Sequence, residues 1–554
     1  MQSNNLPCVV DCHNIIISNI KNGETLCYSV VLVKGSVTRN EAAACRWPIT
    51  KIHMRQYVSN DTKPIESEWP VFNSEFKCLA SLSVGNNHIL LEYCGTKTEF
   101  MVIHQPMKTN YHVLPVYIIC SGHDGRFQAP AAEDNTVQSA CERIALGAKL
   151  IQCLIAEKLH EAGFKKKTFQ LEHDINPSAP ECVVFHSHLS VDDARKMQPT
   201  ELWEYFGREL MLSTLGNTSR KFLAFLSCTR YHLKSLDNMP ITHEDIVSNT
   251  EAHVALGGGG LAVFGSACLH TWPTSIEDVV PRFLNQSKID TRYFMDDSCY
   301  RGTYGGCFAT TLGAVCHELG HTFDLGHSTG GIMGRGFDSI DMAFTVQPWN
   351  DNDRIINGNR SVISPIFKEM PQHSTVCLTK IFTVSYSVPS PTGNMLDKSQ
   401  KEPNITINSS RTNDIEKPVN AVVHEENRNT PSPNYLRNEC SSQNRLLKTG
   451  EDCAYWSRSC AALLNYHRWF NDEYLSHRSL GTIMFDKSRN TVSSSAGVRV
   501  VEMRDMEGLI LSSWVFPELQ GKELFPLPSE AFTESPHVIV AEDSVGNVLR
   551  HVLS

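Results

Sequence analysis

Residues 316–327 read Cys-His-Glu-Leu-Gly-His-Thr-Phe-Asp-Leu-Gly-His, and this stretch decides how the chain is interpreted. Ahead of it, Phe308, Leu312 and Val315 recur at helical spacing, which predicts a helix that carries His317 and His321. Two histidines four residues apart project from one face of a helix, so both imidazoles can reach one metal ion. The stretch therefore predicts a metal site built on a helix.

The remaining parts of a catalytic metal site follow from the same stretch. A catalytic zinc ion takes three protein ligands and keeps a fourth position open, and His327 can supply the third ligand after the helix ends. Glu318 lies beside the ligands, close enough to accept a proton from a metal-activated water. We expect one Zn²⁺ ion held by His317, His321 and His327, with Glu318 as general base for peptide hydrolysis.

The stretch resembles the extended signature of the metzincin metallopeptidases, in which His-Glu-x-x-His is followed by a glycine and a third histidine, here His327. Residues 331–334, Gly-Ile-Met-Gly, resemble the Met-turn of that clan. By this resemblance, Met333 would pack beneath the metal ligands without binding the metal.

Four further stretches resemble a family of eukaryotic zinc metalloproteinases: 257–264, 271–273, 334–338 and 466–470. The likeness covers most of 108–345 and 450–554, and more weakly the N-terminal region. It implies a metzincin-like α/β catalytic domain with endopeptidase activity. It also implies that a strand at 261–266 forms the sheet edge that pairs with an extended peptide, although a glycine-rich loop packed on the helix is equally compatible with the residues.

Asp324 departs from the metzincin pattern, which has glycine at this position. If the chain reverses here with a positive φ, aspartate is among the few other residues that tolerate it, at a cost of about 1 kcal/mol. Alternatively, Gly326 makes the bend and Asp324 accepts a hydrogen bond from a ligand, or Asp324 itself binds the metal. The assignment of His327 as third ligand depends on this turn.

A second group that stabilises the developing oxyanion is not evident from the sequence. Arg335, Tyr466 and His467 are candidates, and a core or surface role is an alternative for His467 beside its aromatic neighbours. Cys316 precedes the first ligand and should point into the core.

Composition limits the possible partners. The formal net charge of -10 argues against a nucleic-acid-binding face, and no apolar stretch reaches the roughly eighteen residues of a membrane span. The start of the sequence lacks the basic and apolar segments of a secretory signal, and the 19 cysteines show no paired short spacing. We expect a cytoplasmic protein with reduced thiols, acting on a protein or peptide; the oligomeric state stays open.

A chain of 554 residues should contain several domains, and we predict a multi-domain α+β protein. An N-terminal β-sandwich-like domain (1–107) is followed by the α/β catalytic domain (108–345), with strands at 113–120, 168–172, 183–186 and 222–227 and helices at 136–162 and 200–211. An insertion (346–450), disordered from about 386, precedes a helix at 454–475 within the segment 451–480, which completes the catalytic domain. A small β-module (481–554) ends the chain.

Two alternatives to an enzyme remain at this stage. The chain could be a binding or scaffold protein whose zinc site is vestigial, or the zinc could be structural, with a distant cysteine as fourth ligand. The intact Glu318 favours the enzyme, because a structural site needs no base.

Overall fold

The computed structural model describes residues 12–39, 50–58, 63–234, 242–346, 453–472, 481–517 and 521–553. All of them belong to one compact unit. The predicted insertion lies outside these residues, apart from residue 346. Among the described helices, none combines the length and the apolar character that crossing a bilayer requires.

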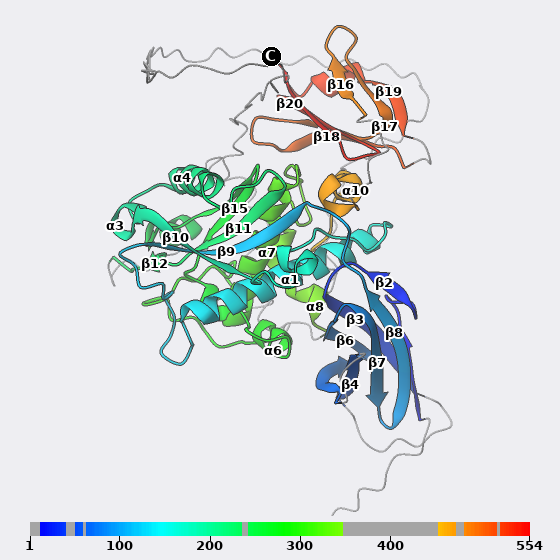
Figure 1. Cartoon of the computed structure of the whole chain (residues 1–554), viewed down its shortest axis with the longest axis vertical. Coiled ribbons are helices and arrows are strands. Elements are labelled where there is room, and N and C mark those ends of the chain that lie inside the picture. The colour runs from blue at the N-terminus through cyan, green and yellow to red at the C-terminus, as the bar shows by residue number, and fades with distance from the viewer. Residues whose placement is uncertain are drawn as a thin grey trace, which may run out of the picture. The chain divides into compact units, whose positions relative to one another are not determined.

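A five-stranded sheet forms the centre of the region that carries the predicted site (Figure 1). Its order is β10-β9-β11-β15-β14, and its first four strands are parallel. The fifth, β14, is antiparallel to β15 and forms one edge. The strands are β9 (His112–Ser121), β10 (Val183–Ser190), β11 (Arg220–Leu226), β14 (Ala255–Gly258) and β15 (Leu261–Gly265).

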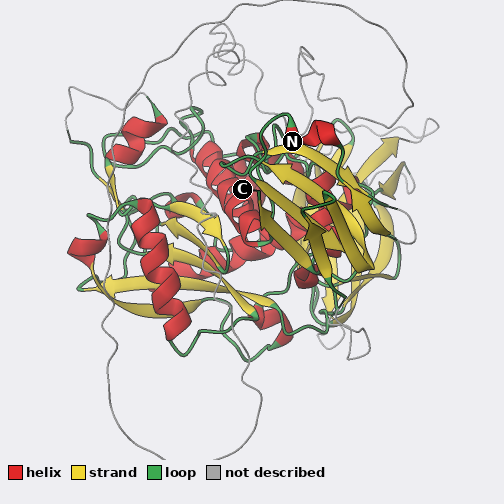
Figure 2. Ribbon diagram, turned by 90° about the horizontal axis from the view of Figure 1, so that it is seen from above, coloured by secondary structure: helices red, strands yellow, loops and turns green. Residues whose placement is uncertain are grey.

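Helices cover both faces of this sheet, because its strands alternate apolar side chains between two cores. Tyr117, Phe225 and Phe264 face the core that contains α1 (Val137–Glu161) and α7 (Tyr304–Thr322). The residues next to them in sequence face a second core, which contains α3 (Val191–Ala194) and α4 (Pro199–Leu212). Figure 2 shows the strands lying between helices. The predicted α/β layering is confirmed.

The strand predicted at 168–172 is wrong. Only one bridge, between Val113 and Leu171, joins this segment to the sheet. The Asp174 carboxylate accepts a hydrogen bond from the Leu171 N–H at 2.8 Å and turns the chain into α2 (Glu172–Ile175). The remaining elements up to residue 346 are short: β12 (Arg230–Tyr231), α5 (His243–Ser248), β13 (Thr250–Glu251), η1 (Leu269–Thr271), α6 (Val279–Phe283), η2 (Gly336–Ser339) and α8 (Asp341–Phe344).

The described residues from 13 to 104 form strands and no helix. An eight-stranded path runs in the order β1-β3-β6-β5-β4-β7-β8-β2. β5 joins its two halves, pairing with β4 through residues 65–70 and with β6 through Val71 and Phe72. The strands are β1 (His13–Ile17), β2 (Glu24–Leu26), β3 (Val30–Arg39), β4 (Lys51–Val58), β5 (Ile65–Phe72), β6 (Glu75–Ser81), β7 (Gly85–Tyr93) and β8 (Thr96–His104). The sandwich and the boundary at 107 stay predictions.

The helix predicted at 454–475 is shorter than expected. α10 spans Arg458–Tyr466 and ends because His467 adopts an extended ψ of 135°, after which η3 (Arg468–Phe470) follows. Beyond it lies a six-stranded sheet in which the long strand β17 pairs with four others. The elements of this C-terminal sheet are β16 (Ile483–Asp486), β17 (Thr491–Arg504), β18 (Ile510–Val515), β19 (Lys522–Pro526), η4 (Ser529–Phe532), β20 (Val538–Asp543) and β21 (Val548–Val552).

Candidate metal centre

The three predicted histidines come together at the C-terminal end of α7. Thr303 caps the start of this helix by accepting a hydrogen bond from the Gly306 N–H. His317 and His321 lie on its last turns, and His327 follows the helix end. The ligand nitrogens of all three lie within 4.8 Å of one another, so the predicted juxtaposition is present in the structure.

Each imidazole is oriented by a backbone carbonyl. The Nδ1 atom of His317 lies 2.8 Å from the Ile332 oxygen, and that of His321 lies 2.9 Å from the Leu325 oxygen. The Nδ1 atom of His327 lies 3.0 Å from the oxygen of Glu507. A carbonyl can only accept, so each Nδ1 carries the proton and each Nε2 carries a lone pair.

These lone pairs face one another. The Nε2 atoms of His317 and His321 are 3.1 Å apart, and the Nε2 atom of His327 is buried without a hydrogen bond among the described residues. Two lone pairs at that distance repel unless a cation lies between them. Tetrahedral zinc with Zn–N bonds of about 2.0–2.1 Å separates its nitrogen ligands by roughly 3.4 Å. The His317–His321 pair therefore fits a zinc ion after a shift of a few tenths of an ångström, and the His327 nitrogen lies within 4.8 Å of both.

The protonation of the three histidines also suits a metal. Burial, followed by the neighbouring His327, lowers the pKa of His317 to about 3. Burial likewise lowers the pKa of His321 and of His327. Imidazoles must be neutral to bind a metal, so no proton has to leave these rings at neutral pH.

Asp324 makes the reversal that brings His327 back to the helix. Its φ is +66°, whereas Gly326 has no positive φ. The Asp324 carboxylate points away from the ligand nitrogens and forms ion pairs with Arg550 and, at 3.3 Å, with His467. Burial alone would raise the pKa of this carboxyl, but Arg550 and His467 outweigh it and hold the pKa well below its usual value. Of the three possible roles of Asp324, the structure shows the first, in which Asp324 makes the turn.

Glu318 lies at the contact between α7 and the sheet edge. Burial raises the pKa of its carboxyl to about 8, and a backbone hydrogen bond from Gly257 partly offsets this rise. A side chain at Gly257 would collide with the Glu318 backbone, since its Cβ would lie 1.8 Å from the Glu318 oxygen. The edge strand β14 thus packs directly on the helix turn that carries the expected base.

The strand implied as the sheet edge is corrected by the topology. The segment 261–266 contains β15, which is paired on both sides, with β11 and with β14. The edge is β14, which ends at Gly258, three residues before β15 begins at Leu261. The glycine pattern that suggested an edge thus belongs to the β14–β15 hairpin, of which only β14 has an open side.

Met333 lies beneath the metal-binding turn of α7. It is 1% exposed, and a Cβ atom added to Gly320 would lie 2.8 Å from its sulfur atom. Gly320 lies between the two helical ligands, so its lack of a side chain lets the Met333 thioether approach the backbone there. The preceding residue, Ile332, supplies the carbonyl that orients His317.

The C-terminal sheet also holds the metal centre, which the sequence did not indicate. The backbone N–H of His327 donates to the Gly508 oxygen, and the His327 oxygen accepts from the Ile510 N–H, both at 2.9 Å. Arg504 donates from Nη2 to the Asp324 oxygen at 2.7 Å. Residues 504–510 therefore fix both the turn and the third histidine from 180 positions away along the chain.

The other candidate residues take different roles. Cys316 is buried in the core, as predicted. His467 binds Asp324, and the Tyr466 ring lies under the Arg499 guanidinium at 4.9 Å, so neither lies in the ligand cluster. Arg335 is linked to the site through Phe337: its guanidinium is 5.1 Å from the Phe337 ring, which in turn is 5.2 Å from the His317 ring.

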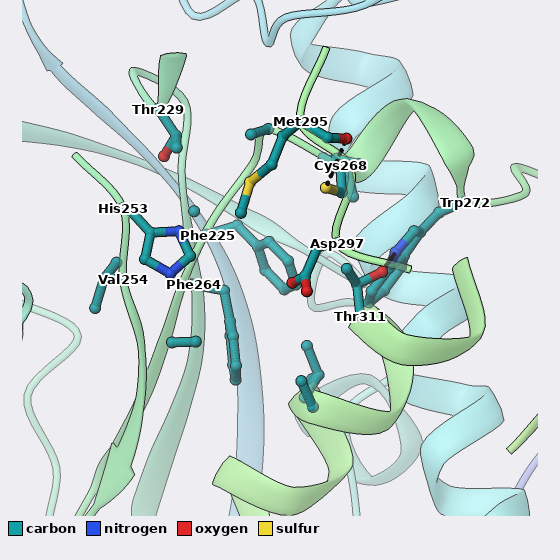
Figure 3. A pocket seen from close by; sticks show the side chains of 16 residues that line it. Phe225, Thr229, His253, Val254, Phe264, Cys268, Trp272, Met295, Asp297 and Thr311 are labelled. Atoms are coloured by element: carbon teal, nitrogen blue, oxygen red, sulfur yellow. Dashed lines mark hydrogen bonds between the residues drawn. The ribbon is translucent and has the colours of Figure 1, made fainter. Parts of the chain in front are cut away.

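A small cavity lies one helical turn before Glu318. It measures about 50 Å³ and lies between α7, the start of β14 and the segment 295–297. Figure 3 shows the Asp297 carboxylate and the His253 imidazole on different sides of it. Burial raises the pKa of Asp297 and lowers that of His253 to about 4. The other lining residues include Phe225, Phe264, Trp272, Met295, Ala314 and Val315.

Comparisons with known proteins agree with a peptidase. Residues 14–419 match the model of a family described as "Putative peptidase family". A Schizosaccharomyces pombe protein named "Putative zinc metalloproteinase" is 28% identical over 351 residues, which cover 60% of this chain and 54% of that protein. A Saccharomyces cerevisiae protein with the same description is 24% identical over 302 residues, covering 50% and 42%. The chain thus spans about half the length of the curated relatives it matches.

One solved structure shows a weak similarity to this chain. Catalytically inactive OgpA from Akkermansia muciniphila, in complex with an O-glycopeptide substrate, matches 80% of this chain and 93% of its own. The identity is 12% and the TM-score is 0.35. That TM-score is too low to establish a shared fold.

Proposed function

The chain belongs to the family described as "Putative peptidase family", and from this membership we propose that it is a zinc-dependent endopeptidase of the metzincin type. The observation that carries the proposal is the convergence of three Nε2 lone pairs, each fixed by a carbonyl on the opposite ring nitrogen. His317, His321 and His327 would hold one Zn²⁺ ion. Zinc is also the metal in the names of the two yeast relatives.

Glu318 is the residue we propose as general base. When bound, zinc supplies a Lewis acid for the peptide carbonyl and lowers the pKa of water. The Glu318 carboxylate accepts the proton of the attacking water and later donates it to the leaving amine. Burial favours the protonated form of Glu318, with a pKa near 8, and a cation beside it favours the carboxylate. Glu318 and the attacking water can therefore exchange a proton near neutral pH.

The open side of β14 is where we propose that the substrate backbone binds. An edge strand presents unpaired N–H and C=O groups to an extended peptide. Gly257 on this strand packs against the backbone of Glu318, so a peptide paired with β14 would pass beside the base. The strand and the helix thus together form a site for main-chain recognition.

The alternatives receive less support. A structural zinc site would have a fourth protein ligand, whereas the group among the described residues contains three. In a binding protein with a vestigial site, the Glu318 carboxyl would not need to lie buried beside the ligands, where burial raises its pKa. We therefore retain the enzyme as the function that the site supports best.

The direct test combines metal content with cleavage. Purified full-length protein should contain zinc at the triad and cleave members of a peptide library, and His321→Ala should lose both that zinc and all cleavage. Removing zinc with a chelator should abolish cleavage, and added zinc should restore it. If the wild type cleaves no peptide, or His321→Ala cleaves as well as the wild type, the proposal is wrong.

The cavity leads to a prediction about the preferred substrate. Glu318 and Ala314 are one turn apart on α7, about 6 Å, and Gly257 and Ala255 are about 6.6 Å apart on β14. A peptide paired with β14 would therefore place a side chain over the cavity within a residue or two of the scissile bond. Its walls are mostly apolar. Asp297, whose side chain is 22% exposed, supplies a carboxylate that lies 3.7 Å from the Nδ1 atom of His243. We expect a preference for lysine or arginine at this substrate position.

Matched peptides that carry lysine, norleucine or glutamate at each position around the scissile bond would measure the preference. Asp297→Asn should lower kcat/KM for the lysine peptide about tenfold, equivalent to about 1.4 kcal/mol, and leave the norleucine peptide unchanged. Asp290→Asn, on an exposed ion pair with Arg292, is the control. Equal losses for both peptides would mean that Asp297 has no role in selecting the substrate.

A further inference from the structure

A second group of ligand atoms lies in the N-terminal sheet, at the start of β1. The Cys12 Sγ atom is 3.0 Å from the Nδ1 atom of His13 and 3.2 Å from the Sγ atom of Cys94. Across the described residues, only two groups of three or more histidine, cysteine or acidic side chains bring their ligand atoms within 4.8 Å of one another. The other group is the histidine triad.

Close thiols alone do not distinguish this group, but the imidazole does. Cys120 and Cys228 also bring their sulfur atoms to 3.6 Å, in the core between the central sheet and its helices. No third ligand atom of the described chain joins that pair. At Cys12 and Cys94, in contrast, the His13 ring is held in place by an edge-to-face contact with Tyr93, with centroids 5.0 Å apart.

The backbone at Cys94 is unusual for a cysteine. Cys94 and Gly95 connect β7 to β8 as a two-residue turn, with φ values of +52° and +83°. Turns of this kind favour asparagine, aspartate or glycine at the first position, because other side chains are strained at positive φ. A strained conformation that places a thiol 3.2 Å from a second thiol points to a role for the thiol.

We propose that Cys12, His13 and Cys94 form a second metal site, for a thiophilic divalent cation of the Zn²⁺ type. Two sulfur ligands and one imidazole match zinc, whereas magnesium and calcium require oxygen ligands. On binding, each thiol releases one proton to solvent, so two thiolates neutralise the charge of the ion. The fourth position is left to solvent or another ligand.

Distances favour a metal over a disulfide. With Zn–S bonds of about 2.3 Å and Zn–N bonds of about 2.0–2.1 Å, tetrahedral ligands lie roughly 3.4–3.8 Å apart. The observed separations of 3.0 and 3.2 Å need to widen by about half an ångström. A disulfide would require the two sulfur atoms to approach by more than an ångström, to about 2.05 Å, and would give His13 no role.

The site would join parts of the sheet that are far apart in sequence. Cys12 and Cys94 are separated by 82 positions, and the ion would link the start of β1 to the β7–β8 turn. This role does not depend on peptidase activity. The ion would act as a cross-link within the N-terminal sheet.

The decisive variant is Cys94→Asn in the full-length chain, because asparagine suits the turn while removing the thiol. Metal analysis of protein purified with zinc should find two ions in the wild type, one in Cys94→Asn, one in His321→Ala and none in the double variant. Cys141→Ser, which alters a thiol outside the group, should retain both ions. The loss of one ion in Cys94→Asn is thus read independently of the histidine triad.

Cobalt substitution identifies the ligands. Cobalt(II) bound by thiolates gives a sulfur-to-metal charge-transfer absorption in the near ultraviolet, which a site made only of histidines lacks. The band should persist in His321→Ala and disappear in Cys94→Asn. The proposal is overturned if Cys94→Asn binds as much zinc as the wild type, or if a disulfide between Cys12 and Cys94 persists in the zinc-loaded protein.

Discussion

Glu318→Gln is expected to lower the rate of peptide cleavage by about 10²–10⁴-fold while leaving zinc bound. The amide has nearly the same shape as the carboxyl but cannot take the proton of the attacking water. The three metal ligands and their carbonyl partners are unchanged, so the metal content should equal that of the wild type. Single-turnover cleavage of the best library peptide, together with metal analysis of the same samples, measures both quantities.

The chain contains a matched control for this variant. Glu244 also follows a histidine, His243, but lies on the exposed helix α5 and has no second histidine four residues later. Glu244→Gln should therefore cleave at the wild-type rate. Undiminished cleavage by Glu318→Gln would exclude it as general base, while loss of zinc would show that it supports the ligands instead.

Arg504→Gln is expected to weaken zinc binding about 10–100-fold, although the hydrogen bonds of Arg504 go to Asp324 and Glu502 and not to a ligand side chain. Its guanidinium donates to the Asp324 oxygen at 2.7 Å and from Nε to the Glu502 carboxylate at 2.8 Å. Without it, the turn that returns His327 to the helix loses a support, and Glu502 loses a buried partner. Breaking a buried pair of this kind costs about 3–5 kcal/mol. Competition with a coloured chelator gives the zinc affinity, and urea unfolding gives the stability.

Two controls distinguish a weakened turn at Asp324 from a general loss of folding. Arg489→Gln removes an exposed ion pair with Asp486 in the same sheet and should change the stability by no more than about 1 kcal/mol. Arg504→Lys keeps a positive charge without the planar fork, so its zinc affinity should lie between those of the wild type and Arg504→Gln. If folded Arg504→Gln binds zinc as tightly as the wild type, the C-terminal sheet does not stabilise the third ligand.

The parts of the site that depend on local periodicity could be predicted from the sequence. Helical spacing placed His317 and His321 on one face of α7, where the structure has them. The tolerance of aspartate for positive φ gave the turn at Asp324 as one of three possibilities, because this property belongs to one residue and needs no knowledge of distant contacts.

The remaining features depend on tertiary contacts that no local pattern encodes. The segment 168–172 has strand-forming residues, but Asp174 caps the chain and starts α2 instead. Whether β14 or β15 is the edge depends on how β15 pairs with β11, a contact between residues about 39 positions apart. One sequence feature could have indicated that residues 504–510 support the site: Arg504 ends an alternating apolar strand, where a side chain is expected to be buried. In the structure Arg504 is 5% exposed, and a buried arginine needs a partner.

The distance along the chain between His327 and Glu507 has a consequence for protein synthesis. A ribosome that adds about 5–20 residues per second needs roughly 10–40 s to make the 180 residues between them. During this interval the helix with the first two histidines is already complete, but the segment that orients the third has yet to emerge. A newborn chain therefore cannot complete the triad until residues 504–510 have been made and can pair with His327, which delays the onset of any proteolysis by the nascent protein.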